Sequence, residues 1–146
     1  QRTFGPASSA ATKIDAAGMK EGDCAGLIAL QKKYGFVGVR IEDDRRSIVM
    51  VSVQTDQPRE IETIPLRQDT VHLRIDCDFR NRTDKARFYY SLDGQTWTRI
   101  GDTLQMAYTL PHFMGYRFGL FNFATQTPGG HADFDYFRVS NKIAPE

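Results

Sequence analysis

Short runs that alternate between apolar and polar side chains follow one another along most of this chain. The clearest covers residues 71–79, where Val, Leu, Ile, Cys and Phe take every second position and His, Arg and Asp the positions between. This alternation predicts a strand with one buried and one solvated face. Helical periodicity is not sustained anywhere, apart from a turn near residues 14–19. The pattern therefore favours an all-β fold.

The pattern predicts about nine or ten strands, separated by glycine, proline and polar turns. They cover residues 10–14, 25–31, 34–41, 47–54, 60–65, 71–79, 85–91, 97–100, the aromatic block 113–123, and 132–139. Turns are expected at residues 20–23 and 43–46, and Asp93-Gly94 is the strongest hairpin signal. Short strands divided by frequent turns are typical of an all-β sandwich or barrel.

The largest apolar side chains gather near the C-terminus, in the aromatic block and in the strand that follows it. They are Phe118, Leu120, Phe121, Phe123, Phe134, Tyr136, Phe137 and Val139. Aromatic side chains bury the most apolar area per residue. We therefore expect these two strands, joined by a loop, to supply much of the core, with Phe118, Phe121 and Phe134 as its bulk.

Composition narrows the possible functions. With 146 residues the chain is the size of one domain, and 40% hydrophobic and 25% charged residues are ordinary for a globular protein. The formal charge of +1 is far from the basic excess of a nucleic-acid or anionic-membrane partner. The chain starts at Gln1 without a signal-peptide pattern, so we expect a piece cut from a longer protein.

Two cysteines are too few for a disulfide framework. Cys77 falls on the apolar side of its strand, which favours a buried free thiol. A single bridge between Cys77 and Cys24 stays open as the alternative.

The sequence has few arrangements suited to catalysis. His72, His112 and His131 lack a second His or Cys at metal-ligand spacing, and there is no Gly-x-Ser-x-Gly or phosphate-binding glycine loop. Glu60 and Glu62 would share one strand face, as paired carboxylates of a glycanase do. Since a third acid and aromatic surroundings are missing, we interpret them as an exposed edge.

Asp133 and Asp135 share one face of the last strand. Two carboxylates there could ligate calcium, a cation that prefers oxygen ligands. Solvated acids, or partners for Arg117 and Arg138, are the alternative that the spacing alone favours.

Aromatic residues near loops are the remaining candidates for function, because sugar rings stack their C–H faces on aromatic side chains. The candidates are Gln31, Tyr34 and Phe36 near one hairpin end, Trp97 near another, and Phe113 in a loop. For each ring, burial in the core is the competing interpretation.

Five segments occur in an order that resembles a known family. They are Gln1-Arg-Thr-Phe-Gly-Pro6, Gly22-Asp-Cys-Ala-Gly-Leu27, Tyr34-Gly-Phe-Val-Gly-Val39, Tyr90-Ser-Leu-Asp-Gly-Gln-Thr-Trp97 and Ala132-Asp-Phe-Asp-Tyr-Phe137. The series resembles the C-terminal concanavalin A-like β-sandwich of family 43 glycoside hydrolases, the β-xylosidases and α-L-arabinofuranosidases. The resemblance covers roughly residues 1–140 and implies a two-sheet antiparallel jelly roll.

The resemblance also implies a role. In this family the module packs on a five-bladed propeller that holds the catalytic acids, and a loop of the module can bring a Phe to the rim of the active site. Here the matching residue is Phe113. Related modules are classed as carbohydrate-binding and associated with xylan, and related sandwiches often hold a structural calcium, for which Asp135 matches the acid. Strands that precede Gln1 in the family are absent from this sequence, so the sheet is expected to have an exposed edge unless another chain supplies them.

We therefore expect a non-catalytic carbohydrate-binding or accessory module that recognises xylan-type or arabinoxylan-type sugars. Its partners would be a xylan-type oligo- or polysaccharide and the catalytic propeller of a parent hydrolase, in a secreted or periplasmic bacterial protein. A structural domain that completes an active-site rim without binding sugar alone is the second hypothesis. A free-standing glycanase or lyase that uses Glu60 and Glu62 is the third.

Overall fold

The described residues form two antiparallel sheets. The computed structural model describes residues 7–30, 34–53, 57–78, 85–105, 117–124, 129–140 and 143. Their strands are β1 (Ala7–Asp15), β2 (Asp23–Leu30), β3 (Tyr34–Glu42), β4 (Arg45–Val53), β5 (Arg59–Pro65), β6 (Thr70–Asp78), β7 (Lys85–Ser91), β8 (Thr98–Arg99), β9 (Leu104–Gln105), β10 (Arg117–Ala124) and β11 (Asp133–Ser140). No helix occurs among these residues, so none could cross a membrane.

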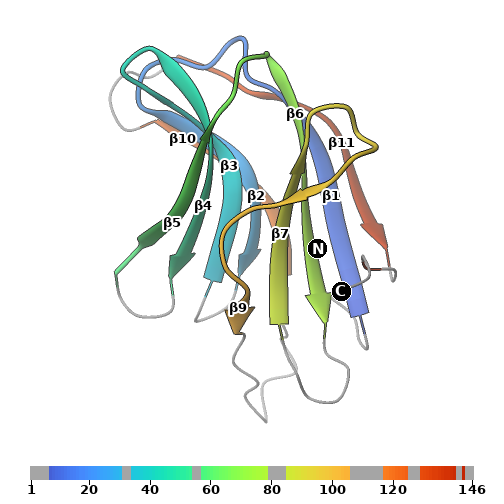
Figure 1. Ribbon diagram of the computed structural model, residues 1–146. Helices are drawn as coiled ribbons and strands as arrows, with labels where there is room; N and C mark the ends of the chain where they lie inside the picture. Colours follow the sequence, from blue (N-terminus) through green and yellow to red (C-terminus); the bar gives the residue numbers. More distant parts are fainter. Residues whose placement is uncertain are drawn as a thin grey trace.

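The two sheets are stacked as the layers of a sandwich (Figure 1). One, which we call the β3 sheet, has the order β10-β2-β3-β4-β5. The other, the β6 sheet, has the order β11-β1-β6-β7-β8, with β9 paired to β7. Every described ladder is antiparallel, so the predicted two-sheet antiparallel sandwich is confirmed. The last two long strands, β10 and β11, lie in different sheets.

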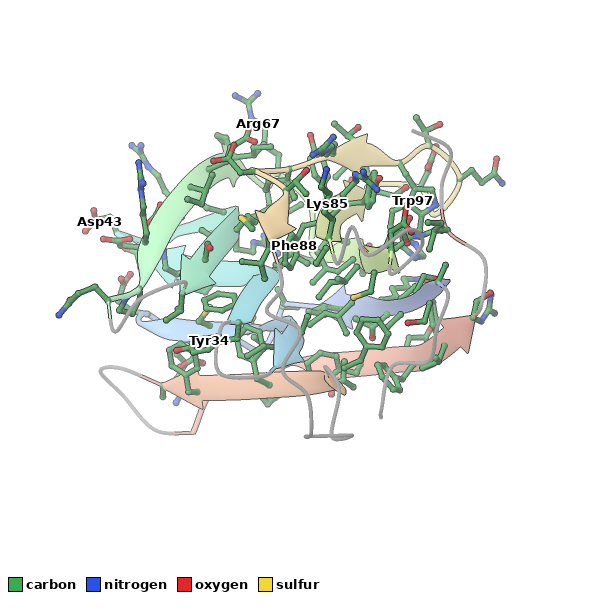
Figure 2. The ribbon with its side chains drawn as sticks, turned by 90° about the horizontal axis from the view of Figure 1, so that it is seen from below. Tyr34, Asp43, Arg67, Lys85, Phe88 and Trp97 are labelled. Carbon is green, nitrogen blue, oxygen red and sulfur yellow. The ribbon has the colours of Figure 1, made fainter. Side chains whose placement is uncertain are left out.

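The core lies between the sheets and is built mostly from aliphatic side chains. Its largest fully buried members are Phe88, Phe118, Ile14, Leu27, Ile48, Met50, Leu73, Ile75, Ile100 and Leu104. Figure 2 shows Phe88 in this layer, between the two sheets. The core-facing side of β6 holds Val71, Leu73, Ile75 and Cys77, as the alternation predicted.

The expectation that the C-terminal aromatic block supplies much of the core is wrong in most of its residues. Phe118 is fully buried, and Phe134 and Val139 pack against the core, as expected. However, Phe123 is 47% exposed, Phe137 37% and Leu120 39%. Two causes combine. Positions alternate along β10, so Phe121 and Phe123 point away from the side that Phe118 takes. In addition, β10 and β11 each stand at the end of their sheet, where fewer neighbours cover a side chain.

Local turns follow the sequence in most places. Residues 14–19 are not helical: β1 runs to Asp15, and the Met19 N–H donates to the carbonyl of Ala16 at 3.1 Å to close a turn. The β3–β4 turn places Asp43 and Asp44 at φ 55° and 59°. The Glu21 carboxylate accepts both of their N–H groups, at 2.9 and 2.8 Å. Strand β9 was not predicted.

Both cysteines are buried free thiols, as expected for Cys77. Cys24 belongs to the β3 sheet and Cys77 to the β6 sheet, and the alternative of a bridge between them is wrong because both are free. Burial raises the pKa of Cys24 to about 12, against a smaller opposing effect of Arg40, and it also raises the pKa of Cys77. Neither thiol is therefore a ready nucleophile.

Candidate functional site

The predicted ligand residues separate into two places. Tyr34 and Phe36 lie on β3, whereas Trp97 directly precedes β8 of the other sheet. In Figure 2, Tyr34 and Trp97 lie on opposite sides of Phe88. Gln31 and Phe113 are outside the described residues. The structure therefore offers two surfaces, one on the outer face of each sheet.

Three phenylalanines form a row on the outer face of the β3 sheet. Val37 and Val39 point into the core, so the alternate residue Phe36 points outward. Its ring meets that of Phe121 edge-on, with centroids 4.8 Å apart and planes at 65°. Phe121 in turn stacks with Phe123 at 5.8 Å and 23°. We call Phe36, Phe121 and Phe123 the aromatic row, and Tyr34 continues the same face of β3.

Two glycines make room for this row. Gly26 of β2 and Gly38 of β3 lie opposite each other in the ladder, so the sheet has no side chain at this point. A Cβ at Gly38 would lie 3.2 Å from Cζ of Phe121 and 2.6 Å from the carbonyl oxygen of Ala25. The ring of Phe121 therefore rests on bare backbone, and the row follows the surface of the sheet.

A polar border lies beside the row, across β4. Arg40 of β3 makes two hydrogen bonds to the carboxylate of Glu60 on β5, at 2.8 and 3.1 Å, above the buried Val49. Glu60 also accepts a hydrogen bond from Thr63. The bonds from Arg40, and then from Thr63, hold the pKa of Glu60 below its usual value.

The proposed pairing of Glu60 with Glu62 on one face is wrong. A register shift in the β4–β5 ladder falls between their partners, Val51 and Met50. Glu62 consequently accepts a hydrogen bond from the N–H of Gly101 at 2.7 Å, while Glu60 is engaged by Arg40. The two carboxylates have separate structural partners and do not form a catalytic pair.

The outer face of the β6 sheet carries a different cluster. Nδ1 of His72 is 2.9 Å from the hydroxyl of Tyr136, and the His72 and Trp97 rings meet edge-on at 6.4 Å. The guanidinium of Arg74 lies 5.8 Å from the centre of the Trp97 ring, and that of Arg138 lies 4.8 Å from the centre of the Tyr136 ring. We call these five residues the Trp97 cluster.

A short loop holds Trp97 in place. The Asp93 carboxylate accepts the N–H groups of Gln95 and Thr96, both at 2.8 Å, and the hydroxyl of Ser91 at 3.0 Å. These bonds, led by that from Thr96, lower the pKa of Asp93 to about 2. Gly94 adopts φ 82°, which a glycine allows, and lies beside the His72 ring. The predicted Asp-Gly turn thus fixes the loop that carries Trp97.

His72 sits at the centre of the Trp97 cluster. Burial, and then the charge of Lys13, lower its pKa, while Asp93 and Asp135 act in the opposite direction. The ring is therefore mostly neutral near pH 7, and it can exchange a hydrogen bond with Tyr136 as donor or acceptor according to its tautomer.

The described side chains do not assemble a calcium site around Asp135. Asp133 and Asp135 are both exposed, and Nε2 of His131 lies 3.9 Å from the carboxylate of Asp133. Residues 7–30, 34–53, 57–78, 85–105, 117–124 and 129–140 contain no group of three His, Cys, Asp or Glu side chains placed to hold a metal ion. A calcium ion at Asp135 stays a prediction that these side chains do not support.

Sequence reasoning missed the partners that complete both surfaces. Phe121, Phe123 and Tyr136 were assigned to the core, and His72 was considered only as a metal ligand and set aside. For the β6 sheet a signal existed: His72 and Arg74 occupy the polar side of the most regular strand. For Phe121 no signal existed, because its neighbours Leu120 and Phe118 are equally apolar.

The fold and the two outer faces define a concanavalin A-like sandwich without a catalytic carboxylate pair among the described residues. Residues 1–140 match the family described as the β-xylosidase C-terminal concanavalin A-like domain. The chain belongs to this family, and it is the accessory domain of such enzymes, not their catalytic propeller.

Known relatives agree with this assignment. A β-xylosidase of Formosa agariphila is 26% identical over 140 residues, which are 94% of this chain and 22% of the relative. A bifunctional GH43-CE protein of Bacteroides eggerthii has a TM-score of 0.94 and 54% identity, over 99% of this chain and 19% of that one. An engineered GH43 glycoside hydrolase described as having endo-xylanase and exo-arabinofuranosidase activity has a TM-score of 0.86 and 30% identity, over 94% of this chain and 30% of that one. This chain thus spans less than a third of each of these proteins.

Proposed function

We propose that this accessory domain binds xylan-type or arabinoxylan-type oligosaccharides on the outer face of the β3 sheet. The observation that carries the proposal is the aromatic row, in which Phe36, Phe121 and Phe123 line up across two strands that are not adjacent in the sheet. A row of rings offers successive apolar contacts to successive sugar units. Half-exposed Phe123 leaves part of this surface open to solvent.

Polar groups beside the row can complete recognition. Tyr34 continues the face of β3 on one side of Phe36, and Arg40 lies beyond Gly38 on the other. A phenol and a guanidinium supply the donors that sugar hydroxyls need. The Arg40–Glu60 pair is exposed enough to exchange bonds with a ligand, since Glu60 keeps 43% of its side-chain surface.

Binding at this face should be weak. A ring contact contributes about 0.5–1.5 kcal/mol beyond its area, so even three contacts at the upper end of this range correspond to a dissociation constant of only about 1 mM. A link to a catalytic domain compensates for weak affinity by raising the effective concentration of the substrate. The length of the relatives, all of which extend well beyond this domain, supports such a link.

The test is a titration of the chain with xylo-oligosaccharides, followed by NMR or calorimetry. Phe36→Ala and Phe121→Ala should each weaken binding about tenfold, because each removes a ring contact. Arg67→Gln, an exposed change outside the β3 sheet face, is the control and should have no effect. Unchanged affinity in both phenylalanine variants would sink the proposal.

A second function is favoured by the apolar side chains at one side of the sandwich. Leu120 of β10 and Phe137 of β11 are 39% and 37% exposed. Such side chains suit a domain that docks on a catalytic propeller and completes its active-site rim. In the full-length enzyme, Phe113→Ala would then reduce activity while the isolated domain binds no sugar.

A further inference from the structure

The Trp97 cluster has a composition that the aromatic row lacks. Two arginines stand at the ends of a series of three rings: Arg138 lies over Tyr136, Tyr136 is bonded to His72, His72 lies against Trp97, and Trp97 lies beside Arg74. These residues come from β11, β6 and the loop before β8, so the fold alone brings them together. Trp97 is half-buried and Tyr136 likewise, which leaves part of each ring open to solvent.

Hydrogen-bond donors dominate this cluster. Arg138 has a fork of five donors and the Trp97 indole has one. Lys13, which lies opposite His72 in the β1–β6 ladder, adds the three donors of its ammonium. Among the described residues, neither Lys13 nor Arg138 forms an ion pair with a carboxylate, whereas Arg74 is bonded to buried Asp76 at 2.6 Å.

Two of the carboxylates near those donors are already bonded. Asp76 accepts from Arg74, and the Asp93 carboxylate is engaged by its own loop. Asp135 is exposed and, like Asp93, acts on the pKa of His72. A ligand that supplies acceptors and negative charge therefore complements the cluster better than a neutral one.

We propose that the Trp97 cluster binds an acidic saccharide, with a uronate carboxylate at Arg138 and Lys13 and a neighbouring sugar ring against Trp97. A carboxylate accepts hydrogen bonds from a guanidinium with matching geometry, and the sugar C–H face stacks on an indole. The site is separate from the aromatic row, on the other sheet, so it does not rest on the function proposed above.

The experiment uses a matched pair of probes: a xylotetraose that carries one glucuronic acid, and the same oligosaccharide with that carboxyl group reduced to an alcohol. The readout is tryptophan fluorescence, which reports only this face because Trp97 is the single tryptophan of the chain. The acidic probe should bind about fivefold more tightly at low salt, and about 0.5 M NaCl should remove most of this preference.

Three variants separate this site from its surroundings. Arg138→Gln should abolish the preference for the acidic probe, while Arg45→Gln, a change of the same kind on β4 of the other sheet, should keep it. Asp135→Asn removes the opposing charge and should strengthen binding of the acidic probe about twofold to threefold. Phe121→Ala should leave it unchanged.

Equal affinity for the two probes, no fluorescence change with either, or a preference that survives Arg138→Gln would each overturn the proposal. Weaker binding of the acidic probe in Asp135→Asn would do the same. The function proposed for the β3 sheet can hold even when this inference fails. Neutral oligosaccharides that bind the parental protein but not Phe121→Ala would show that it does.

Discussion

The outer faces of the two sheets differ in how their aromatic side chains are supported. On the β3 sheet, Phe121 rests on the bare backbone of Gly26 and Gly38 and lies between the rings of Phe36 and Phe123. On the β6 sheet, Trp97 and Tyr136 are held by charged and hydrogen-bonding neighbours. The first surface depends on shape and the second on charge, so substitutions and pH should separate them.

The largest effect is expected where the β3 face depends on glycine. In Gly26→Ala the new Cβ would lie 2.2 Å from the carbonyl oxygen of Val37 and 2.5 Å from Cα of Gly38, so the backbone must shift. We expect a loss of about 2–4 kcal/mol in the free energy of unfolding, measured with urea.

Gly119→Ala is the matched control for Gly26→Ala. Gly119 lies on β10 of the same sheet, but its nearest contact would be an ordinary 3.5 Å, to Ile28. Stability should change by less than about 1 kcal/mol and can rise, because alanine restricts the unfolded chain. Equal losses in the two variants would contradict the role given to Gly26.

A smaller effect is expected when the row loses a ring. Phe121 contacts rings on both sides, whereas Phe123 has one ring neighbour and is 47% exposed. Phe121→Ala should cost about 1–2 kcal/mol and Phe123→Ala less than about 1 kcal/mol in thermal or urea unfolding. The reverse order would mean that Phe123, not Phe121, is the centre of the row.

On the β6 face, the loop that carries Trp97 should respond to acid. The folded pKa of Asp93 is about 2, below its usual 3.8, so its contribution is complete above pH 3.8 and is lost as the pH falls through about 2. The fluorescence emission of Trp97, followed as the pH is lowered from 5, should therefore change only as the pH approaches about 2.

Asp93→Ala tests that assignment directly. The variant leaves the N–H groups of Gln95 and Thr96 without their acceptor, so the emission of Trp97 should already be shifted at pH 7. It should also lack the step near pH 2. If the variant has the emission spectrum of the parental protein and the same change in emission near pH 2, another group positions Trp97.

The smallest effect concerns His72. Its pKa is lowered in the folded protein, mainly by burial, so the unfolded chain takes up a proton first as the pH falls below 6.5. Stability should then fall slightly between pH 7 and pH 5, by less than about 2 °C in the melting temperature, since much of the ring is in contact with water. His72→Gln should flatten this dependence, and a rise in stability over the same range would contradict the sign.

Most strands were predictable because their alternation distinguishes two sides. In β6 the apolar side became the core and the polar side became the outer face, as the residue pattern implied. In β10 the same reasoning fails, because Phe118, Leu120, Phe121 and Phe123 are all apolar and give no preferred side. The choice is made by the tertiary structure, in which Phe118 meets the core and Phe121 meets Phe36.

The candidate surfaces were predicted only in part, because they join residues from distant strands. Tyr34, Phe36 and Trp97 were identified from their places near hairpins, yet nothing in the sequence indicated that Trp97 belongs to the other sheet. The contact of Phe36 with Phe121 depends on β10 pairing with β2, a pairing between segments about ninety residues apart. The register shift that separates Glu60 from Glu62 has no marker in the sequence either.

The exposed side chains at the β10 and β11 ends of the sheets have a consequence for how copies of the protein could aggregate. The opposite ends are protected: β5 carries Glu60 and Pro65, and β8 has only two residues. Among the described residues, no strand pairs with the outer edges of β10 and β11, where Leu120 and Phe137 lie. A molecule that associates only through this side of the sandwich joins one neighbour, and the exposed edges of both copies are then covered. Concentrated solutions should therefore accumulate closed pairs instead of growing filaments.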